Sequence, residues 1–322
     1  MGALLEVQDL RMHIFVRRGV VKAVEGVSCS VDEGETFGLV GESGCGKTMT
    51  CLSILKLVPQ PGGRIVDGRI IFDGEDIVPK SEREMRRIRG RRISMILQDP
   101  MTSLNPAYSI GNQVGEAILI HQKMKRGTLR EKVIEALRLV KIPAAEMRLR
   151  DYPHQMSGGM RQRVTGAIAL GTEPSLLIAD EPTTSLDVTI QAQYLNLLKE
   201  VQLKSKVAMI FVTHDLGIVA RMCDKVAVMY AGRIVEKADT RELFNKPHHP
   251  YTAALMGCLP RLEAGRQRLA SIPGQPPDLS DLPTGCSFAP RCTKSMDICS
   301  HEYPRETAVS DEHHVSCWLM ER

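Results

Sequence analysis

Long hydrophobic runs are missing from this sequence of 322 residues. The longest, near residues 207–212, has the length of a strand and falls far short of the roughly 18 residues that span a bilayer. A strong charge of one sign is missing too, because 42 Lys and Arg against 38 Asp and Glu leave a net charge of only +4. That excess is too mild to indicate a nucleic-acid partner by itself. Hydrophobic and charged fractions of 43% and 25% exclude wholesale disorder, collagen and coiled coil.

A signal-peptide core is also missing, because Glu6 and Asp9 interrupt the first apolar stretch. The sequence therefore predicts a protein kept in the cytoplasm. In that reducing compartment, nine cysteines argue against a disulfide framework. Nine of the 18 prolines lie from Pro247 onward, and four of the cysteines lie close together near the end, namely Cys286, Cys292, Cys299 and Cys317. This shift predicts a boundary near residues 240–250, between a first domain over 1–245 and a second over 246–322.

Before that boundary, short apolar runs alternate with helical stretches. The runs are strand-length, aliphatic on both faces and bounded by polar or glycine-rich turns, and they cover residues 36–40, 93–97, 176–179, 207–212 and 226–230. Such runs are typical of strands that are covered on both faces. Between them we expect helices, one beginning at a capping box of Thr128 and Glu131 and one capped by Asp187. The sequence therefore predicts an α/β fold.

A glycine-rich loop follows the run at 36–40. It has the pattern GxxxxGKT and consists of Gly41, Glu42, Ser43, Gly44, Cys45, Gly46, Lys47 and Thr48. The glycines let backbone N–H groups turn toward phosphate oxygens, and the start of a helix at Met49, expected to end before Pro59, favours negative charge. Lys47 would reach the β- and γ-phosphates, and the Thr48 hydroxyl would ligate Mg²⁺. The flanking strand and helix disfavour the alternative, a turn that binds nothing.

Two carboxylates end the run at 176–179. Asp180 is placed to hold the hydration shell of Mg²⁺, and Glu181 to polarise a water molecule as a general base. The alternative is a strand that ends in a solvated acidic pair. About 20 residues earlier, Ser157 is a candidate helix cap, and Gly158 and Gly159 allow close approach to a phosphate. Taken alone, this segment is equally typical of an ordinary cap and turn.

The serial order of these segments resembles the ATP-binding-cassette (ABC) ATPase family over about residues 4–250. The resemblance implies Walker A at 41–48, a Q-loop at Gln98, a signature at 156–160, Walker B at 176–180, the catalytic Glu181, a D-loop at 185–187 and a switch histidine at His214. It implies Mg²⁺ held by Thr48, Gln98 and Asp180, with Gln98 and His214 acting beside Glu181 in catalysis. It also implies a P-loop NTPase core with antiparallel β and helical subdomains, the helical one over about 99–165. The signature reads MSGGM rather than LSGGQ, and its Ser-Gly-Gly part is intact.

Two further roles follow from this resemblance. The family stacks adenine on an aromatic residue before Walker A, and Phe15 is the candidate, with an ordinary core or surface phenylalanine as the alternative. Ser157, Gly158 and Gly159 would contact ATP that is held on the Walker A loop of a partner. A single chain therefore cannot complete a site, and we expect a dimer of cassettes.

Three segments narrow the resemblance to the dipeptide/oligopeptide/nickel import subfamily, namely residues 98–106, 180–189 and 248–255 followed by the cysteines. The resemblance implies an ATPase that powers peptide import from the cytoplasmic face of the plasma membrane. Its implied partners are a second ATPase cassette, two membrane permeases and an extracytoplasmic peptide-binding protein, without nucleic acid. Importers of nickel, glutathione or another small solute stay open, because the substrate pocket lies on other chains. A different class, an ABC ATPase that never acts at a membrane, is disfavoured because the long insertions of repair types and the paired cassettes of ribosome-acting types are missing.

The last four cysteines are separated by five, six and 17 residues. Structural zinc sites usually take ligands in pairs two to four residues apart, which is closer than any pair here. Wider spacing suits a [4Fe–4S] cluster, and peptide-importer ATPases with similar tails carry one. A zinc site in which His313 or His314 replaces a cysteine, and free thiols in a small core, remain alternatives.

Overall fold

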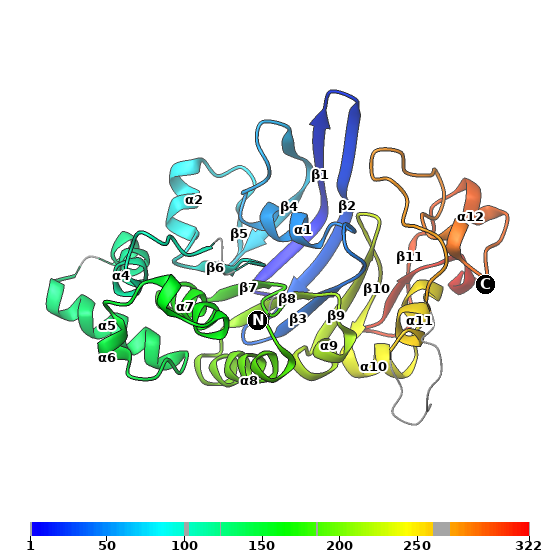
Figure 1. The fold of residues 1–322 in the computed structure, drawn as a ribbon. Coiled ribbons are helices and arrows are strands. Elements are labelled where there is room, and N and C mark those ends of the chain that lie inside the picture. Colours follow the sequence, from blue (N-terminus) through cyan, green and yellow to red (C-terminus); the bar gives the residue numbers. More distant parts are fainter. Residues whose placement is uncertain (1, 100–102, 123, 185, 260–270, 322) are drawn as a thin grey trace. The chain divides into compact units, whose positions relative to one another are not determined.

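The computed structural model describes residues 2–99, 103–122, 124–184, 186–259 and 271–321. These residues form two compact units, whose elements are labelled in Figure 1. The first unit consists of residues 1–31, 36–78 and 213–322, and the second of residues 32–35 and 79–212. None of the described helices is both long and apolar enough to cross a membrane.

An antiparallel sheet forms one part of the first unit. Its strands lie in the order β2-β1-β4-β5, with bounds β1 (Leu5–Val16), β2 (Gly19–Val31), β4 (Gly63–Phe72) and β5 (Glu75–Asp76). Leu5 pairs with Val31 on one side and Phe72 on the other. The alternate residues Leu10 and Met12 are fully buried, because successive side chains of a strand point to opposite faces. Figure 1 shows β1 and β2 as one long paired ribbon.

A second sheet of this unit carries the glycine-rich loop. It has the order β11-β12-β10-β9-β3, with bounds β3 (Thr36–Val40), β9 (Lys225–Tyr230), β10 (Arg233–Asp239), β11 (Glu306–Ala308) and β12 (His314–Ser316). β3 and β9 are parallel, and β10 pairs antiparallel with β9 and with β12. The cysteine-rich segment therefore contributes two strands to the sheet from which the loop emerges.

Short helices complete the first unit. They are α1 (Lys47–Ile54), α9 (Leu216–Met222), α10 (Thr240–Asn245), α11 (Pro250–Gly257) and α12 (Ile298–His301), with 3-10 turns at Ala289–Arg291 and Trp318–Met320. α11 begins at a proline, which suits a first helical position because its missing N–H has no partner there anyway.

The second unit holds three parallel strands and a group of helices. The strands are β6 (Ile93–Ile96), β7 (Leu176–Asp180) and β8 (Ala208–Thr213, all but its last residue in this unit), in the order β8-β7-β6. The helices are α2 (Glu82–Ile88), α4 (Ile110–His121), α5 (Arg126–Leu139), α6 (Ala145–Arg148), α7 (Gly158–Leu170) and α8 (Val188–Ser205), with a 3-10 turn at Pro153–Gln155. α4, α5 and α7 pack together around buried residues such as Val114, Leu137 and Val164.

All five predicted strands are present within a residue of their expected bounds. β3, β7 and β8 are buried along their whole length, as the apolar residues on both faces predicted. The predicted caps at Asp187 and Ser157 are confirmed, because each side chain accepts a hydrogen bond from the backbone three residues on.

Two helix predictions are wrong. The capping box at Thr128 and Glu131 does not begin a helix, since α5 already begins at Arg126, where good helix formers extend the pattern N-terminally. The helix expected to reach Pro59 ends at Ile54, because the chain turns into the left-handed region at Lys56 (φ 51°).

Candidate functional site

The glycine-rich loop is held tightly at its two ends and open at its tip. A Cβ added at Gly41 (φ 154°) would collide with the carbonyl oxygen of Met229, and one added at Gly46 (φ 108°) with that of Ala23. Gly44 (φ 80°) has no neighbour within 4 Å of such a Cβ, and Ser43 beside it is exposed. Gly41 and Gly46 are therefore needed for close packing, and Gly44 leaves room for a ligand.

Lys47 points back along this loop. It is 5% exposed, and its Nζ donates to the carbonyl oxygens of Gly41 (2.8 Å) and Glu42 (3.0 Å). Its ammonium group therefore lies inside the curve of the loop, where a phosphate would meet it. Gly46 precedes α1 without a side-chain cap, so the first-turn N–H groups, including those of half-buried Thr48 and Met49, are suited to an anion.

Cys45 closes the inner side of the loop. Its thiol is buried 3.8 Å from the Lys47 ammonium. Burial raises the pKa of this thiol, and the neighbouring Lys47 opposes the rise. Cys45 therefore serves packing in a neutral form, which fits its tight contact with Gly41.

Phe15 lies near the end of β1 with 45% of its surface exposed. The guanidinium of Arg64 stands 5.5 Å from its ring centre. An exposed ring next to a cation has one face available for stacking. His214, which follows β8, is also exposed, and the next residue, Asp215, caps α9.

The second unit brings Gln98 and Glu181 together. The Gln98 side-chain amide donates to Oε2 of Glu181 at 3.1 Å, and the Thr184 hydroxyl donates to the same oxygen at 3.0 Å. Glu181 has a left-handed backbone (φ 45°), anchored by a hydrogen bond from its N–H to the carbonyl of Val212 (3.0 Å). A non-glycine residue in this region marks local strain, which often accompanies function. The role of Thr184 was not predicted, although its place in the segment after Glu181 is a usable signal.

Asp180 immediately precedes this strained residue. It ends β7 and is 2% exposed, so its carboxylate lies at the carboxyl end of a buried parallel strand, where α/β proteins place ligands. Thr48 belongs to the first unit, whereas Gln98 and Asp180 belong to the second. Their expected joint role in holding Mg²⁺ therefore stays a prediction.

The signature segment is the exposed start of α7. Ser157 is exposed, and its Oγ accepts from the N–H of Met160 at 3.4 Å. Gly158 has nothing within 4 Å of an added Cβ, whereas one at Gly159 would lie 2.6 Å from Cγ2 of Ile190 on α8. The two glycines therefore have different roles. Gly159 permits α7 to pack closely against α8, whereas Gly158 faces open space. In the D-loop, Ser185 lies outside the described residues.

The four cysteines of the tail line one small cavity, together with His249, Phe288 and Trp318. Backbone N–H groups of Lys294 and Met296 donate to the sulfurs of Cys292 (3.4 Å) and Cys299 (3.5 Å). Burial raises the pKa of Cys286 to about 11, and the pKa of Cys292 and Cys317 are raised for the same reason. No three His, Cys, Asp or Glu side chains among the described residues stand close enough together to hold a single metal ion.

The two histidines of the zinc alternative lie elsewhere. His313 is fully buried, with Nε2 2.8 Å from Oε1 of Glu236 and Nδ1 3.3 Å from Oε1 of Glu242. His314 lies by Glu306 (3.6 Å). Neither is among the residues that line the cysteine cavity, so the structure gives no support to a zinc site in which His313 or His314 replaces a cysteine.

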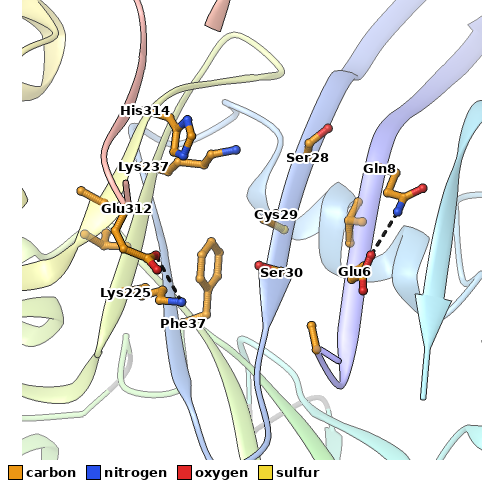
Figure 2. Close-up of a pocket in the computed structure, with 14 residues that line it drawn as sticks. Glu6, Gln8, Ser28, Cys29, Ser30, Phe37, Lys225, Lys237, Glu312 and His314 are labelled. Carbon is orange, nitrogen blue, oxygen red and sulfur yellow. Dashed lines mark hydrogen bonds and ion pairs between the residues drawn. The ribbon is translucent and has the colours of Figure 1, made fainter. Parts of the chain in front are cut away.

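A larger cavity of about 440 Å³ lies in the same unit. Figure 2 shows Ser28 and Cys29 of β2 on one wall and Lys237 and His314 on the other, with Phe37 between them. Burial raises the pKa of Cys29 to about 12. No residue of the glycine-rich loop lines this cavity, so it is separate from the phosphate site.

Comparisons with known proteins agree with this geometry. A family model described as "ABC transporter" matches residues 24–184, and one described as "Oligopeptide/dipeptide transporter, C-terminal region" matches residues 235–299. The chain belongs to the ABC transporter family of ATP-binding proteins and is an ABC ATPase. It carries in addition the C-terminal region of oligopeptide/dipeptide transporters.

Individual relatives cover the whole chain. It is 51% identical over 322 residues to the dipeptide transport ATP-binding protein DppD of Bacillus subtilis, covering 100% of this chain and 96% of the relative. It is 50% identical to the oligopeptide transport ATP-binding protein OppD of the same organism, with 98% and 89% covered. The Escherichia coli DppD is 46% identical, with 98% and 96% covered.

Solved structures confirm the cassette fold. The cassette cbiO1 from Clostridium perfringens, part of the ABC transporter complex cbiONQ, has a TM-score of 0.66 at 28% identity and covers 76% of this chain and 92% of its own. The dimeric structure of the bacterial ABC transporter cassette MJ0796 also has a TM-score of 0.66 at 23% identity, with 74% and 99% covered. As a member of the ABC ATPase family, this chain is expected to use ATP and Mg²⁺.

Proposed function

We propose that this chain is the ATP-hydrolysing subunit of a membrane importer for di- or oligopeptides. The observation that carries the proposal is the full-length identity of about 50% to dipeptide and oligopeptide transport ATP-binding proteins, which includes the tail. Importers of nickel, glutathione or other small solutes are the second candidate, because no pocket for the transported solute is expected on this subunit.

The residues of the two units divide the chemistry. Lys47 and the N–H groups of the loop bind the β- and γ-phosphates, and Phe15 stacks on adenine. Thr48, Gln98 and Asp180 would hold Mg²⁺, which would neutralise charge on the phosphates when bound. Glu181 takes a proton from the attacking water, and Gln98 and Thr184 keep its carboxylate oriented, as their hydrogen bonds to Oε2 indicate. His214 contacts the γ-phosphate.

Assembly completes the site. Ser157, Gly158 and Gly159 bind ATP held by a second cassette, and the exposure of Ser157 supports this contact. The other partners are two membrane permeases and an extracytoplasmic peptide-binding protein, and this chain lies peripherally on the cytoplasmic face of the membrane. Within the chain, residues 1–245 form the cassette, 99–165 its helical subdomain and 246–322 the tail domain.

Reconstitution tests the proposal. The chain is purified with a second cassette and two permeases, placed in vesicles, and supplied with a peptide-binding protein. Uptake of a radiolabelled dipeptide that requires ATP and the binding protein supports peptide import. Uptake of nickel or glutathione but of no peptide would favour the second candidate.

For the tail we propose a structural [4Fe–4S] cluster held by Cys286, Cys292, Cys299 and Cys317. The convergence of all four thiols on one cavity and the two N–H···S hydrogen bonds support a cluster. Such hydrogen bonds accompany thiolate ligands of iron–sulfur centres, whose irons lie apart and need ligands from several directions. A cluster takes ligands that lie farther apart than those of a single ion. It is therefore compatible with the finding that no three such side chains among the described residues lie close enough together to hold one ion.

The cluster has a direct test. Anaerobically purified protein should be brown, absorb near 400 nm and contain about four irons per chain. Cys292→Ser should remove the colour while nucleotide binding by the cassette is measured separately. Colourless protein with one zinc per chain would contradict the cluster and keep a four-thiolate site.

A further inference from the structure

Arg291 connects the cysteine-rich tail directly to the glycine-rich loop. It ends the 3-10 turn Ala289–Arg291, one residue before Cys292. Its Nη1 donates to Oε2 of Glu42 at 2.7 Å and its Nη2 to Oε1 at 3.0 Å. Glu42 is the second residue of the loop, 249 positions earlier in the chain. This two-pronged geometry is the strongest form of an arginine–carboxylate contact.

The guanidinium is fixed on all sides. Nη1 also donates to the hydroxyl of Tyr230 at 3.2 Å, and Nε donates to the carbonyl of Pro273 at 2.9 Å. The Arg291 side chain is 4% exposed and that of Glu42 is 28% exposed. The hydrogen bonds with Glu42 raise the pKa of Arg291 above its already high value, so Arg291 keeps its charge. Removing Glu42 is costly, because the buried guanidinium would be left without its charged partner.

Glu42 is also tied to the chemistry of the loop. Its N–H donates to the hydroxyl of Tyr251 at 3.0 Å, and its carbonyl accepts from Nζ of Lys47 at 3.0 Å. Tyr251 packs against Tyr230 and Phe288, with ring centres 4.6 Å and 5.3 Å away. Phe288 in turn lines the cysteine cavity. One aromatic cluster thus joins the cavity wall to the backbone that positions the phosphate-binding lysine.

We propose that Arg291 is a positioning residue for ATP binding, which fixes the phosphate loop from the tail and makes nucleotide affinity depend on the folded tail. The proposal rests on the ATP binding by the loop that is proposed above, and it does not depend on whether the cysteines carry a metal. By reciprocity, ATP in the loop must stabilise the tail by the same free energy that the tail contributes to ATP binding.

The first test measures ATP affinity of the full-length chain in the presence of Mg²⁺. Arg291→Met and Glu42→Gln should each weaken binding by about fivefold or more, the range of typical couplings. The double variant should be no weaker than the poorer single variant, because both remove the same link. Lys237→Met is the matched control, since it removes a different ion pair to the tail (Glu306, 2.9 Å) and should keep wild-type affinity.

ATP binding is measured below the unfolding temperature of each variant. Unfolding is monitored by the fluorescence of Trp318, which is the single tryptophan and lines the cysteine cavity. A purely structural arginine would lower that temperature and leave affinity unchanged, which would overturn the proposal. Equal weakening by Lys237→Met would overturn it too, because any loosening of the tail would then suffice.

The second test reads the reciprocal effect by hydrogen–deuterium exchange. ATP with Mg²⁺ should slow exchange in residues 286–299 of the wild-type chain and of Lys237→Met. In Arg291→Met the same addition should leave these residues unaffected while the loop itself is still protected at saturating ATP. Tail protection that persists in Arg291→Met would contradict the coupling. If ATP did not slow exchange in the loop of the wild-type chain, that result would instead contradict ATP binding by the loop. Failure of the coupling and failure of the proposed ATP site are therefore distinguishable.

Discussion

At the scale of single residues, Glu181 combines a strained backbone with an oriented carboxylate. Its backbone is left-handed, with φ 45°, and Gln98 and Thr184 both donate to Oε2. These two hydrogen bonds orient the carboxylate, as the proposed role of Glu181 as general base requires. Non-glycine residues with a left-handed backbone are often found in active sites, which agrees with that proposed role.

Glu181→Gln should therefore lower kcat by about a hundredfold or more, the usual contribution of a general base, while ATP affinity stays near that of the wild-type chain. Steady-state ATPase assays of the assembled transporter, together with ATP titrations, measure the two quantities. Hydrolysis at the wild-type rate would show that another group polarises the water.

Lys47→Ala should act differently, because the proposed role of Lys47 is to contact phosphate in the bound state, before any chemistry. We expect ATP binding to weaken by about tenfold or more, in line with the loss of a charge-assisted hydrogen bond of roughly 1.5–3 kcal/mol. Titration of the isolated chain measures this effect. An unchanged Kd would remove Lys47 from the phosphate site.

At the scale of elements, the start of α7 depends on one glycine. A Cβ at Gly159 would approach Cγ2 of Ile190 on α8 to 2.6 Å, and a β-branched side chain in a helix has one strongly preferred rotamer and cannot easily turn away. Gly159→Ala should destabilise the chain by about 1–3 kcal/mol, as overpacking does. Denaturant unfolding measures the change.

Its neighbour provides the control. Gly158→Ala has open space around the new methyl group and should leave the unfolding free energy within about 0.5 kcal/mol, as surface changes do. Adding Ile190→Ala to Gly159→Ala should relieve the clash, so that the pair is less destabilising than the sum of the two single changes. Strict additivity would contradict the packing account.

The attachment of the tail depends on a buried carboxyl group on β10. Glu236 is fully buried and accepts hydrogen bonds from the backbone N–H groups of His248 (2.7 Å) and His249 (3.0 Å), and Nε2 of His313 lies 2.8 Å from it. Glu236→Ala should destabilise the tail by about 3 kcal/mol, because two buried polar groups, on His249 and His313, and the part-buried N–H of His248 lose their partner. Glu242→Ala, which removes a half-buried contact with the same histidine, should cost less than about 1 kcal/mol. Thermal unfolding followed by Trp318 fluorescence compares the two, and equal effects would contradict the central role of Glu236.

Elements differ in how far the sequence predicts them. β3, β7 and β8 were predictable because continuous burial demands apolar residues on both faces. The loop at 41–48 was predictable because phosphate binding demands glycines and a lysine at fixed spacing. The pairing of β12 with β10 and the contact of Arg291 with Glu42 were not predictable. Both join residues far apart in the chain, and neither a three-residue strand nor a single arginine carries a local signal of its partner.

At the scale of the whole molecule, the proposed dimer of cassettes divides each ATP site between two chains. In that dimer the loop at 41–48 would bind nucleotide in its own site, and the segment Ser157–Gly159 would serve the partner cassette. Ser157→Arg should therefore leave the ATP affinity of the isolated chain unchanged and abolish hydrolysis in the mixed dimer, because a large cation would occupy the position next to the partner's phosphates. Equal loss of ATP binding by the isolated variant would contradict the trans assignment.

The most direct test of the central claim is peptide uptake by vesicles that contain this chain, its partner cassette, the two permeases and the binding protein. ATP-dependent accumulation of a labelled dipeptide should be lost with Glu181→Gln and kept with Lys237→Met. Uptake that continues at the wild-type rate with Glu181→Gln, while ATP hydrolysis by this chain has stopped, would contradict the role of this chain in powering peptide import.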